Sequence, residues 1–363
     1  MHTPWGTLEE LNLDDRTLAE KILCADKHQL VEGMIVECLF DQFLDNLPKD
    51  LPGVVAIDVE TVIAQTERPH NKRLAVVWAR TKSAGLGRYL IALGKRFHVV
   101  LVEYDANRGF FGALMHGAKR VSSVKTLDEL MRPFAAIGHT PFEVARSVRD
   151  ENRQREAIWG FLFAHHGERL ASKVLLPRIL INCGIQPWFQ YVWNLDRIFI
   201  VDGDLWLFEV KHKFPFLDRR SQALKFGLND GELSIFRELL GCGIESLFSI
   251  MVKPKWSKEI GSLYMMTDLA ARNRTAVISK VLDGGTIRRL YAGVSGVSGA
   301  GTTITGVQDS KLKYKSLYAS EFGMTGRFSE KPSEIAERIV GELRGLPRPL
   351  VKDEELYELK MSD

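Results

Sequence analysis

Asn194-Leu-Asp-Arg-Ile-Phe-Ile-Val-Asp-Gly-Asp-Leu-Trp-Leu-Phe-Glu-Val-Lys-His-Lys213 is a stretch in which two short apolar runs flank Asp202-Gly203. The runs Arg197–Val201 and Leu205–Val210 are rich in β-branched, aromatic and aliphatic residues, which predicts two strands. Asp-Gly favours a two-residue hairpin turn, because both central positions of that turn need a positive φ. The stretch is therefore predicted to be a β-hairpin that turns at Asp202-Gly203.

The position of the turn sets the strand register. Counting outward from it predicts the opposed pairs Val201/Asp204, Ile200/Leu205, Ile198/Leu207 and Asp196/Glu209. Opposed residues have Cβ atoms about 4.5–5.5 Å apart, and the two-residue period of a strand places Lys211 on the same face as Glu209. Asp196, Glu209 and Lys211 are thus predicted to lie together. The other face is also apolar, which predicts a central hairpin covered on both sides.

Such a group of side chains has a specific chemistry. Two facing carboxylates beside a core repel each other and lose solvation, and they are tolerated when a cation lies between them. Oxygen ligands suit Mg²⁺ or Mn²⁺, which retain several waters and bind substrate phosphates. A lysine two residues further on can orient an attacking water or neutralise charge that develops on a phosphate. The predicted group is therefore suited to cleaving phosphodiesters.

Asp196 and Glu209-Val210-Lys211 together resemble the active-site motif of the PD-(D/E)XK nuclease superfamily, over roughly residues 160–255. Leu195 stands where a proline often precedes the aspartate, but that proline is not needed for the chemistry. The resemblance implies a restriction-endonuclease-like core of order α-β-β-β-α-β. It also implies that Asp196, Glu209 and the Val210 carbonyl hold Mg²⁺ or Mn²⁺, and that Lys211 positions the nucleophilic water.

The segments around the hairpin extend this resemblance. Gly167–Leu180 is predicted to be the preceding helix, and in the resembled superfamily such a helix often donates another glutamate, here Glu168. The alternative is that Glu168 is an exposed first-turn residue favoured by the helix dipole. Downstream, a helix from about Asp230 is predicted to end at Gly241 to Gly243, and Glu232 stands where several restriction- and resolvase-like members have a glutamine.

A basic segment with interleaved aromatic residues follows the hairpin. Its predicted nucleic-acid-binding residues are Lys213, Arg219, Arg220 and Lys225. Positive charge alternating with rings suits a nucleic-acid groove. The alternative is a solvated loop that covers the core.

Composition places the chain among ordinary globular proteins. Its 363 residues are sufficient for two or three domains, and it is 45% hydrophobic and 26% charged with a formal net charge of +3. Four scattered cysteines without a C-x-x-C pair indicate reduced thiols. No apolar run approaches a membrane span and no signal-peptide pattern is present, so the expectation is a cytoplasmic protein with no membrane partner.

Four segments are predicted along the chain. They are a helical segment at 1–50, a small Rossmann-like parallel α/β accessory domain at 51–150, the nuclease core at 151–260, and a C-terminal extension at 261–363 with a Gly/Ser-rich loop. The accessory domain is expected because strand-like runs alternate with helix-like runs at Arg88–Lys95 and Phe110–Lys119. The helical segment is expected to pack on the rest of the chain, with homodimer formation as an alternative role.

Two motifs in the accessory domain have a chemical and a structural interpretation. Lys82-Ser-Ala-Gly-Leu-Gly-Arg88 is a glycine loop between a strand and a helix, where phosphate can bind, or simply a tight turn. Ile57-Asp-Val-Glu-Thr61 superficially resembles the opening motif of proofreading-type exonucleases, but no clear partners for it follow in the sequence.

The sequence thus predicts an α/β protein with a restriction-endonuclease-like core that acts as a Mg²⁺-dependent endonuclease. The base rate of the resembled superfamily favours DNA over RNA as the substrate. The alternative is a non-catalytic nucleic-acid-binding or nucleotide-sensing α/β protein.

Overall fold

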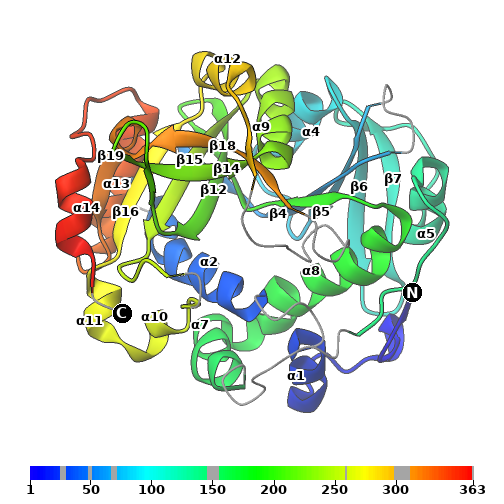
Figure 1. Cartoon of the computed structure of the whole chain (residues 1–363). Coiled ribbons are helices and arrows are strands. Elements are labelled where there is room, and N and C mark those ends of the chain that lie inside the picture. Colours follow the sequence, from blue (N-terminus) through cyan, green and yellow to red (C-terminus); the bar gives the residue numbers. More distant parts are fainter. Residues whose placement is uncertain are drawn as a thin grey trace. The chain divides into compact units, whose positions relative to one another are not determined.

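The computed structural model of the chain describes residues 1–24, 30–47, 51–66, 72–144, 155–257, 260–297 and 311–361 (Figure 1). The chain divides into two compact units. Unit 1 comprises Met1–Ile35 and Ile57–Asp196, and unit 2 comprises Val36–Ala56 and Arg197–Asp363. The boundary expected near residue 150 lies outside the described residues, and the predicted domain limits stay predictions.

Unit 1 contains a mixed sheet of order β10-β4-β5-β6-β7-β8, with β9 also paired to β7. Its strands are β4 (Val59–Ala64), β5 (Leu74–Ala79), β6 (His98–Asp105), β7 (Gly109–His116), β8 (Lys119–Arg120), β9 (Lys125–Thr126) and β10 (Val192–Leu195). Only β5 and β6 are parallel, and α4 (Leu86–Gly94) joins them. The remaining pairs are antiparallel.

The mixed α/β class predicted for the chain is confirmed, but the parallel sheet predicted for 51–150 is wrong. The main reason is that the helix predicted at Phe110–Lys119 is strand β7, which pairs antiparallel with β6. Residues on both faces of β7 are apolar and largely buried. A short apolar run of this kind has no period that separates a buried strand from a buried helix.

The helices of unit 1 are short. They include α1 (Arg16–Cys24), α5 (Leu127–Met131), α7 (Phe163–His166) and α8 (Leu176–Ile179), the π-helical turns Ile158–Leu162, Ala171–Leu175 and Leu180–Ile185, and the 3₁₀ turns Leu8–Glu10, Arg132–Phe134, Gly167–Arg169 and Gln186–Trp188. A two-stranded sheet of β1 (His2–Thr3) and β2 (Gly6–Thr7) precedes them. The helix predicted at Gly167–Leu180 is present, with 3₁₀, π and α hydrogen bonding in succession, since the junction residues Leu170, Leu175 and Leu180 all have helical φ and ψ. Gly167, at its start, has a φ of +55°.

Unit 2 contains a six-stranded mixed sheet of order β19-β16-β15-β12-β11-β3. Its strands are β3 (Val54–Ile57), β11 (Arg197–Val201), β12 (Asp204–Lys213), β15 (Ile244–Val252), β16 (Ala276–Val281) and β19 (Gly323–Arg327). Strand β12 lies between β11, to which it is antiparallel, and β15, to which it is parallel. A central strand with an apolar pattern on both faces is the arrangement that the sequence predicts.

The hairpin of β11 and β12 has the predicted turn and register. Asp202 and Gly203 have φ values of +49° and +96°, as a two-residue hairpin turn requires. The pairs Val201/Asp204, Ile200/Leu205 and Ile198/Leu207 are all present. The predicted register of the paired residues is therefore confirmed.

The crossover between β12 and β15 includes α9 (Asp230–Cys242). The Asn229 side chain accepts a hydrogen bond from Gly231 N, and Gly243 ends the helix with a φ of +78°. Leu233, Phe236 and Leu239 recur at helical spacing and are buried, and α9 packs on β15 and β14. These caps and this apolar face match the helix that the sequence predicts here.

A second sheet of unit 2 has the order β13-β14-β18-β17. Its strands are β13 (Phe216–Asp218), β14 (Ala223–Asn229), β17 (Gly296–Val297) and β18 (Lys313–Tyr318), and the 3₁₀ turn Ala319–Glu321 follows β18. The remaining helices are α2 (Leu30–Leu44), which begins in unit 1 and ends in unit 2, and α10 (Tyr264–Thr267), α11 (Leu269–Asn273), α12 (Gly284–Ala292), α13 (Pro332–Leu343) and α14 (Asp353–Leu359). Figure 1 shows α13 beside β16 and β19, on which it packs.

Among the described residues, none of the helices combines the length and the apolar character that crossing a bilayer requires.

Candidate functional site

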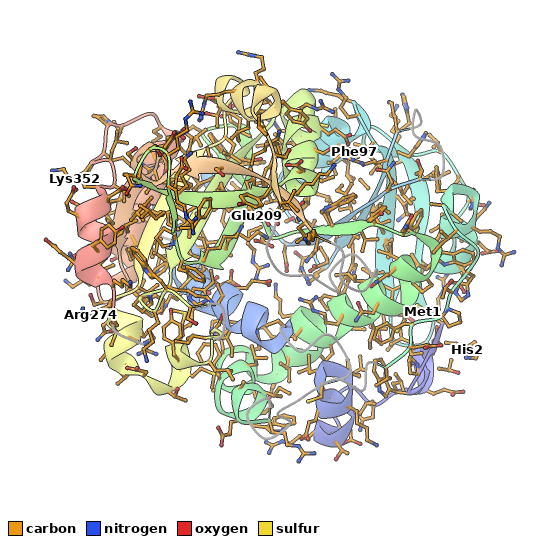
Figure 2. The ribbon with its side chains drawn as sticks, in the orientation of Figure 1. Met1, His2, Phe97, Glu209, Arg274 and Lys352 are labelled. Carbon is orange, nitrogen blue, oxygen red and sulfur yellow. The ribbon has the colours of Figure 1, made fainter. Side chains whose placement is uncertain are left out.

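Glu209 is a buried carboxylate on the central strand of unit 2 (Figure 2). It is 5% exposed, and the residues that flank it on β12 are Phe208 and Val210, both buried and apolar. Burying a charge this deeply is unfavourable unless partners compensate for it. The neighbours of Glu209 therefore determine what it can do.

Lys211 and Glu232 are the charged neighbours of Glu209. The Lys211 ammonium lies 2.6 Å from Glu209 Oε1 and 3.1 Å from Glu232 Oε1. Lys211 shares the face of Glu209 because it is two residues further along β12, and Glu232 comes from the first turn of α9. One ammonium thus bridges two carboxylates that reach it from a strand and from a helix.

The two carboxylates have opposite shifts in pKa. Burial, reinforced by the negative charge of Glu232, raises the pKa of Glu209 above its ordinary value, although Lys211 opposes the shift. Burial would also raise the pKa of Glu232, but the charges of Lys211 and Lys213 and the hydrogen bonds that it accepts outweigh burial and lower it. Pairs of acids whose pKa values are pushed apart by their surroundings are typical of catalytic sites.

The carboxylates also have spare capacity to coordinate a cation. Glu232 Oε2 is buried and has no hydrogen-bond partner among the described residues. Carboxylate oxygens of this kind suit Mg²⁺ or Mn²⁺. Within the described part of unit 2, no three carboxylate, imidazole or thiol ligand atoms lie within 4.8 Å of one another. Glu209 and Glu232 are two carboxylates that share the Lys211 ammonium, and their oxygens are donors of the type that divalent cations bind.

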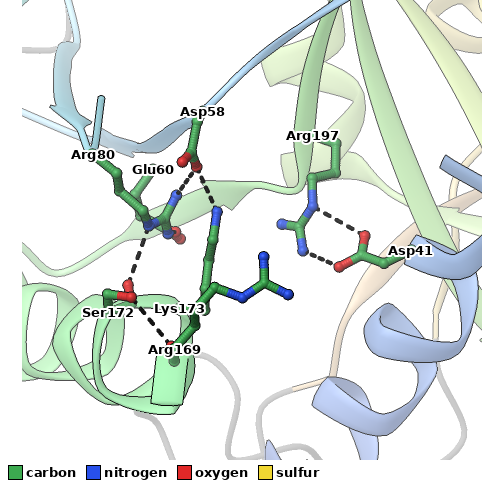
Figure 3. A network of polar contacts seen from close by, with 8 residues as sticks. All are labelled: Asp41, Asp58, Glu60, Arg80, Arg169, Ser172, Lys173 and Arg197. Carbon is green, nitrogen blue, oxygen red and sulfur yellow. Dashed lines mark hydrogen bonds and ion pairs between the residues drawn. The ribbon is translucent and has the colours of Figure 1, made fainter. Parts of the chain in front are cut away.

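Helix α2 contributes a residue that the sequence analysis missed. The negative charge of Glu37 is a further, smaller cause that raises the pKa of Glu209. Asp41, one turn further along α2, forms a bidentate ion pair with Arg197 at the start of β11 (Figure 3), with Nε–Oδ1 at 3.0 Å and Nη2–Oδ2 at 2.5 Å. No local signal in Val36–Leu44 indicates that it packs with a hairpin about 160 residues further on.

Asp196 is the residue directly before β11. The ladder ends at the pair Arg197/Phe208, so extending it by one pair would set Asp196 opposite Glu209, as the sequence predicts. Asp196 is the last residue of unit 1, whereas Glu209 belongs to unit 2. Its role as a metal ligand stays a prediction, as does that of the Val210 carbonyl.

Glu168 also stays a prediction as a metal ligand. It lies in the 3₁₀ turn Gly167–Arg169, where it is exposed, and it belongs to unit 1. In unit 2, the helices that bring a glutamate charge to bear on Glu209 are α9, with Glu232, and α2, with Glu37.

The four predicted nucleic-acid-binding residues have different surroundings. The Lys213 side chain is half-buried, its ammonium donates a hydrogen bond to Gly227 O at 2.7 Å, and burial lowers its pKa. Lys225 forms an ion pair with Asp218 at 2.6 Å. Arg219 and Arg220 are exposed between β13 and β14. The two arginines are thus the members of this set that are exposed to solvent.

Unit 1 contains a second group of charged residues, at the motif Ile57–Thr61. Arg80 donates hydrogen bonds to Asp58 Oδ1 at 3.2 Å, to Glu60 and to Ser172 O (Figure 3). The Lys173 ammonium lies 2.8 Å from the same Asp58 oxygen. Burial would raise the pKa of Asp58, but Lys173 and Arg80 together lower it. The two acids of this motif are thus matched by two cationic side chains.

Comparison of the chain with protein-family models, with curated proteins and with solved structures finds no match.

Proposed function

We propose that the chain is a Mg²⁺- or Mn²⁺-dependent phosphodiester hydrolase that acts on nucleic acid through Glu209, Lys211 and Glu232. The observation that carries the proposal is the bridge from the Lys211 ammonium to the buried Glu209 and to Glu232. The order of β11, β12, α9 and β15 supports it, because an antiparallel hairpin followed by a helical crossover to a parallel strand resembles a restriction-endonuclease-like core.

Each residue has a distinct role in this proposal. Glu209 and Glu232 would hold the cation, and Asp196 is an additional ligand if the ladder extends by one pair. When bound, Mg²⁺ supplies a Lewis acid that polarises the phosphoryl oxygen and lowers the pKa of a bound water. Lys211 orients the attacking water and neutralises charge on the phosphate as the bond breaks. Arg219 and Arg220 provide exposed charge for the nucleic-acid backbone.

A metal-dependence assay tests this proposal. Supercoiled plasmid, linear duplex DNA, single-stranded DNA and RNA are incubated with the chain in Mg²⁺, in Mn²⁺ and in EDTA. Cleavage of at least one substrate is expected with metal and not with EDTA, and Glu209→Gln should lower the rate at least 100-fold, of the order that one well-placed catalytic group contributes. Glu245→Gln, on the neighbouring strand β15, is the matched control and should cleave like the wild type.

Two results would overturn the proposal. One is the absence of metal-dependent cleavage on all four substrates. The other is wild-type cleavage by Glu209→Gln. Binding of nucleic acid or nucleotide without any cleavage would instead favour a non-catalytic binding protein.

A further inference from the structure

The sheets of the two units have the same order of strand directions. In unit 1, β4 and β5 are antiparallel, β5 and β6 are parallel, and β6 and β7 are antiparallel. In unit 2, the corresponding strands are β11, β12, β15 and β16, and their directions follow the same sequence. A helix lies in the crossover between the parallel strands in each unit, α4 in unit 1 and α9 in unit 2. The two units therefore share one core topology.

The strand that flanks each hairpin extends the correspondence. The neighbour of β4 is β10, which directly precedes β11 in the chain. The neighbour of β11 is β3, which directly precedes β4 in the chain. Each hairpin is thus completed by the strand that precedes the other hairpin. Such a reciprocal exchange is expected if the chain contains two copies of one folding unit.

Matching the parallel ladders assigns equivalent positions. The ladder of unit 1 begins at Leu74/His98 and that of unit 2 at Leu205/Ile244. Counting from these pairs, Trp78 takes the position of Glu209 and Arg80 takes the position of Lys211. Trp78 and Arg80 lie on one face of the sheet, as Glu209 and Lys211 do, because the Arg80 guanidinium lies 4.9 Å from the centroid of the Trp78 ring.

The same count matches the remaining acids. Glu60 is paired with Trp78 in the ladder of β4 and β5, so it takes the position of Asp196. The third residue of each crossover helix is Glu232 in α9 and Arg88 in α4. Of the four charged positions, unit 1 thus keeps one acid, replaces Glu209 by an apolar ring and replaces Glu232 by an arginine.

We propose that unit 1 is a second copy of the core of unit 2, in which the metal site has become a structural ion-pair cluster, so that each chain has one cleavage site. Trp78 offers no ligand where Glu209 stands in unit 2. The remaining acids, Asp58 and Glu60, form ion pairs with Arg80, and Asp58 also pairs with Lys173. The cluster instead links β4 and β5 to Ala171–Leu175, since Arg80 and Lys173 reach across between them.

The inference that unit 1 lacks a metal site rests on the function proposed for unit 2. The shared core topology and the structural role of the ion-pair cluster do not. The inference predicts opposite effects of equivalent substitutions in the two units. Removing the Glu209 carboxylate of unit 2 should abolish metal binding, whereas removing the Glu60 or Asp58 carboxylate of unit 1 should lower stability and leave metal binding unchanged. Removing one partner of a buried ion pair is strongly destabilising, because it leaves the other charge uncompensated, and Glu60 is 7% exposed.

The experiment is calorimetric titration of the full chain with Mn²⁺, together with thermal unfolding of each variant without metal. Glu209→Gln should lose all the Mn²⁺ that the wild type binds and should unfold at or above the wild-type temperature, because its carboxylate is unfavourably buried. Glu60→Gln should bind as much Mn²⁺ as the wild type and should unfold several degrees lower. Asp58→Asn, at a half-buried position, repeats the unit 1 test if Glu60→Gln does not fold.

The results separate the two proposals. Loss of bound Mn²⁺ in Glu60→Gln or Asp58→Asn would overturn the inference that unit 1 lacks a metal site, while leaving the proposed nuclease function intact. Wild-type thermal stability of both unit 1 variants would overturn the structural role of the cluster. Absence of Mn²⁺ binding by the wild type would refute the metal-dependent function. It would also refute the proposal that each chain has one cleavage site, in unit 2.

Discussion

Among single residues, Lys211 has a large expected effect on the charge of the site. Its ammonium is the shared partner of Glu209 and Glu232. Lys211→Met leaves two carboxylates close together without the cation that bridges them. We expect a loss of about 2–4 kcal/mol in the free energy of unfolding at neutral pH, the lower end of the cost of breaking a buried pair, because Lys211 is partly exposed.

The size of this loss should depend on pH. Protonation of Glu209 removes the repulsion, and its pKa is already raised by burial and by Glu232. The destabilisation by Lys211→Met should therefore shrink as the pH falls, which urea unfolding at pH 7 and near pH 5 measures. Adding Glu232→Gln to Lys211→Met should recover most of the loss at neutral pH. An equal loss at both pH values would contradict this account of the charge balance.

His212 predicts a second pH dependence, which concerns stability alone. Its ring nitrogens lie 2.8 Å from Ser262 Oγ and 2.7 Å from Tyr264 Oη. Burial, with the charge of Lys253, lowers the pKa of His212 to about 3. In the unfolded chain the pKa is about 6.5, so the unfolded state binds the proton more readily. The stabilising contribution is therefore present above pH about 6.5 and is lost as the pH falls towards the folded pKa, by about 1.4 kcal/mol per pH unit.

Substitution of His212 tests this dependence. His212→Gln should flatten the fall in the free energy of unfolding between about pH 6.5 and pH 4.5, measured by urea titration. His116→Gln, at an exposed position on β7, is the control and should leave the slope unchanged. If the free energy of unfolding of His212→Gln falls with pH as steeply as that of the wild type, groups other than His212 cause the loss of stability in acid.

At the scale of elements, the hairpin turn decides which side chains share a face. Gly203 has a φ of +96°, and the turn is held by the Asp202 N–H, which donates to Gly53 O at 2.8 Å. Gly203→Ala places a Cβ in a conformation that costs an ordinary residue about 1–2 kcal/mol. Urea unfolding should show a loss of that size. Gly203→Asn should lose less, since asparagine adopts positive φ more readily, and equal stability of all three proteins would contradict the strain argument.

The elements also show what the sequence was able to predict. The register of β11 and β12 was predictable because turn chemistry at Asp202-Gly203 is local and a slip by one residue would reverse the faces of the strand. The limits of α9 were predictable from Asn229 and Gly243, which cap it. Strand β7 was not, because its apolar run has no distinguishing period.

At the scale of the molecule, the sequence could not indicate that the two units exchange segments. Val36–Ala56 belongs to unit 2 although unit 1 follows it in the chain, and no residue pattern records a partner so distant. This is why Glu168, which precedes the hairpin in sequence, was the expected helical glutamate and Glu37 was missed. Of the site residues predicted on the continuous stretch Asn194–Lys213, Glu209 and Lys211 are the two that the structure brings into contact.

The exchange predicts how fragments of the chain behave. A fragment Arg197–Asp363 lacks β3 and α2, which leaves the edge of β11 unpaired. It also removes the buried rings of Phe40 and Phe43, and Phe43 packs on Phe328 with ring centroids 5.6 Å apart.

Since the loss of one such ring costs on the order of 3–5 kcal/mol, this fragment should show no cooperative thermal transition by circular dichroism. A synthetic peptide spanning Val36–Ala56, added in excess, should restore a transition whose midpoint rises with peptide concentration, because binding stabilises only the folded state. The same peptide with Phe43→Ser is the matched control and should restore little, since it lacks the ring that packs on Phe328. If the fragment alone unfolds cooperatively at the temperature of the intact chain, Val36–Ala56 is dispensable for the stability of unit 2. The strand β3 would then not be a necessary part of its core.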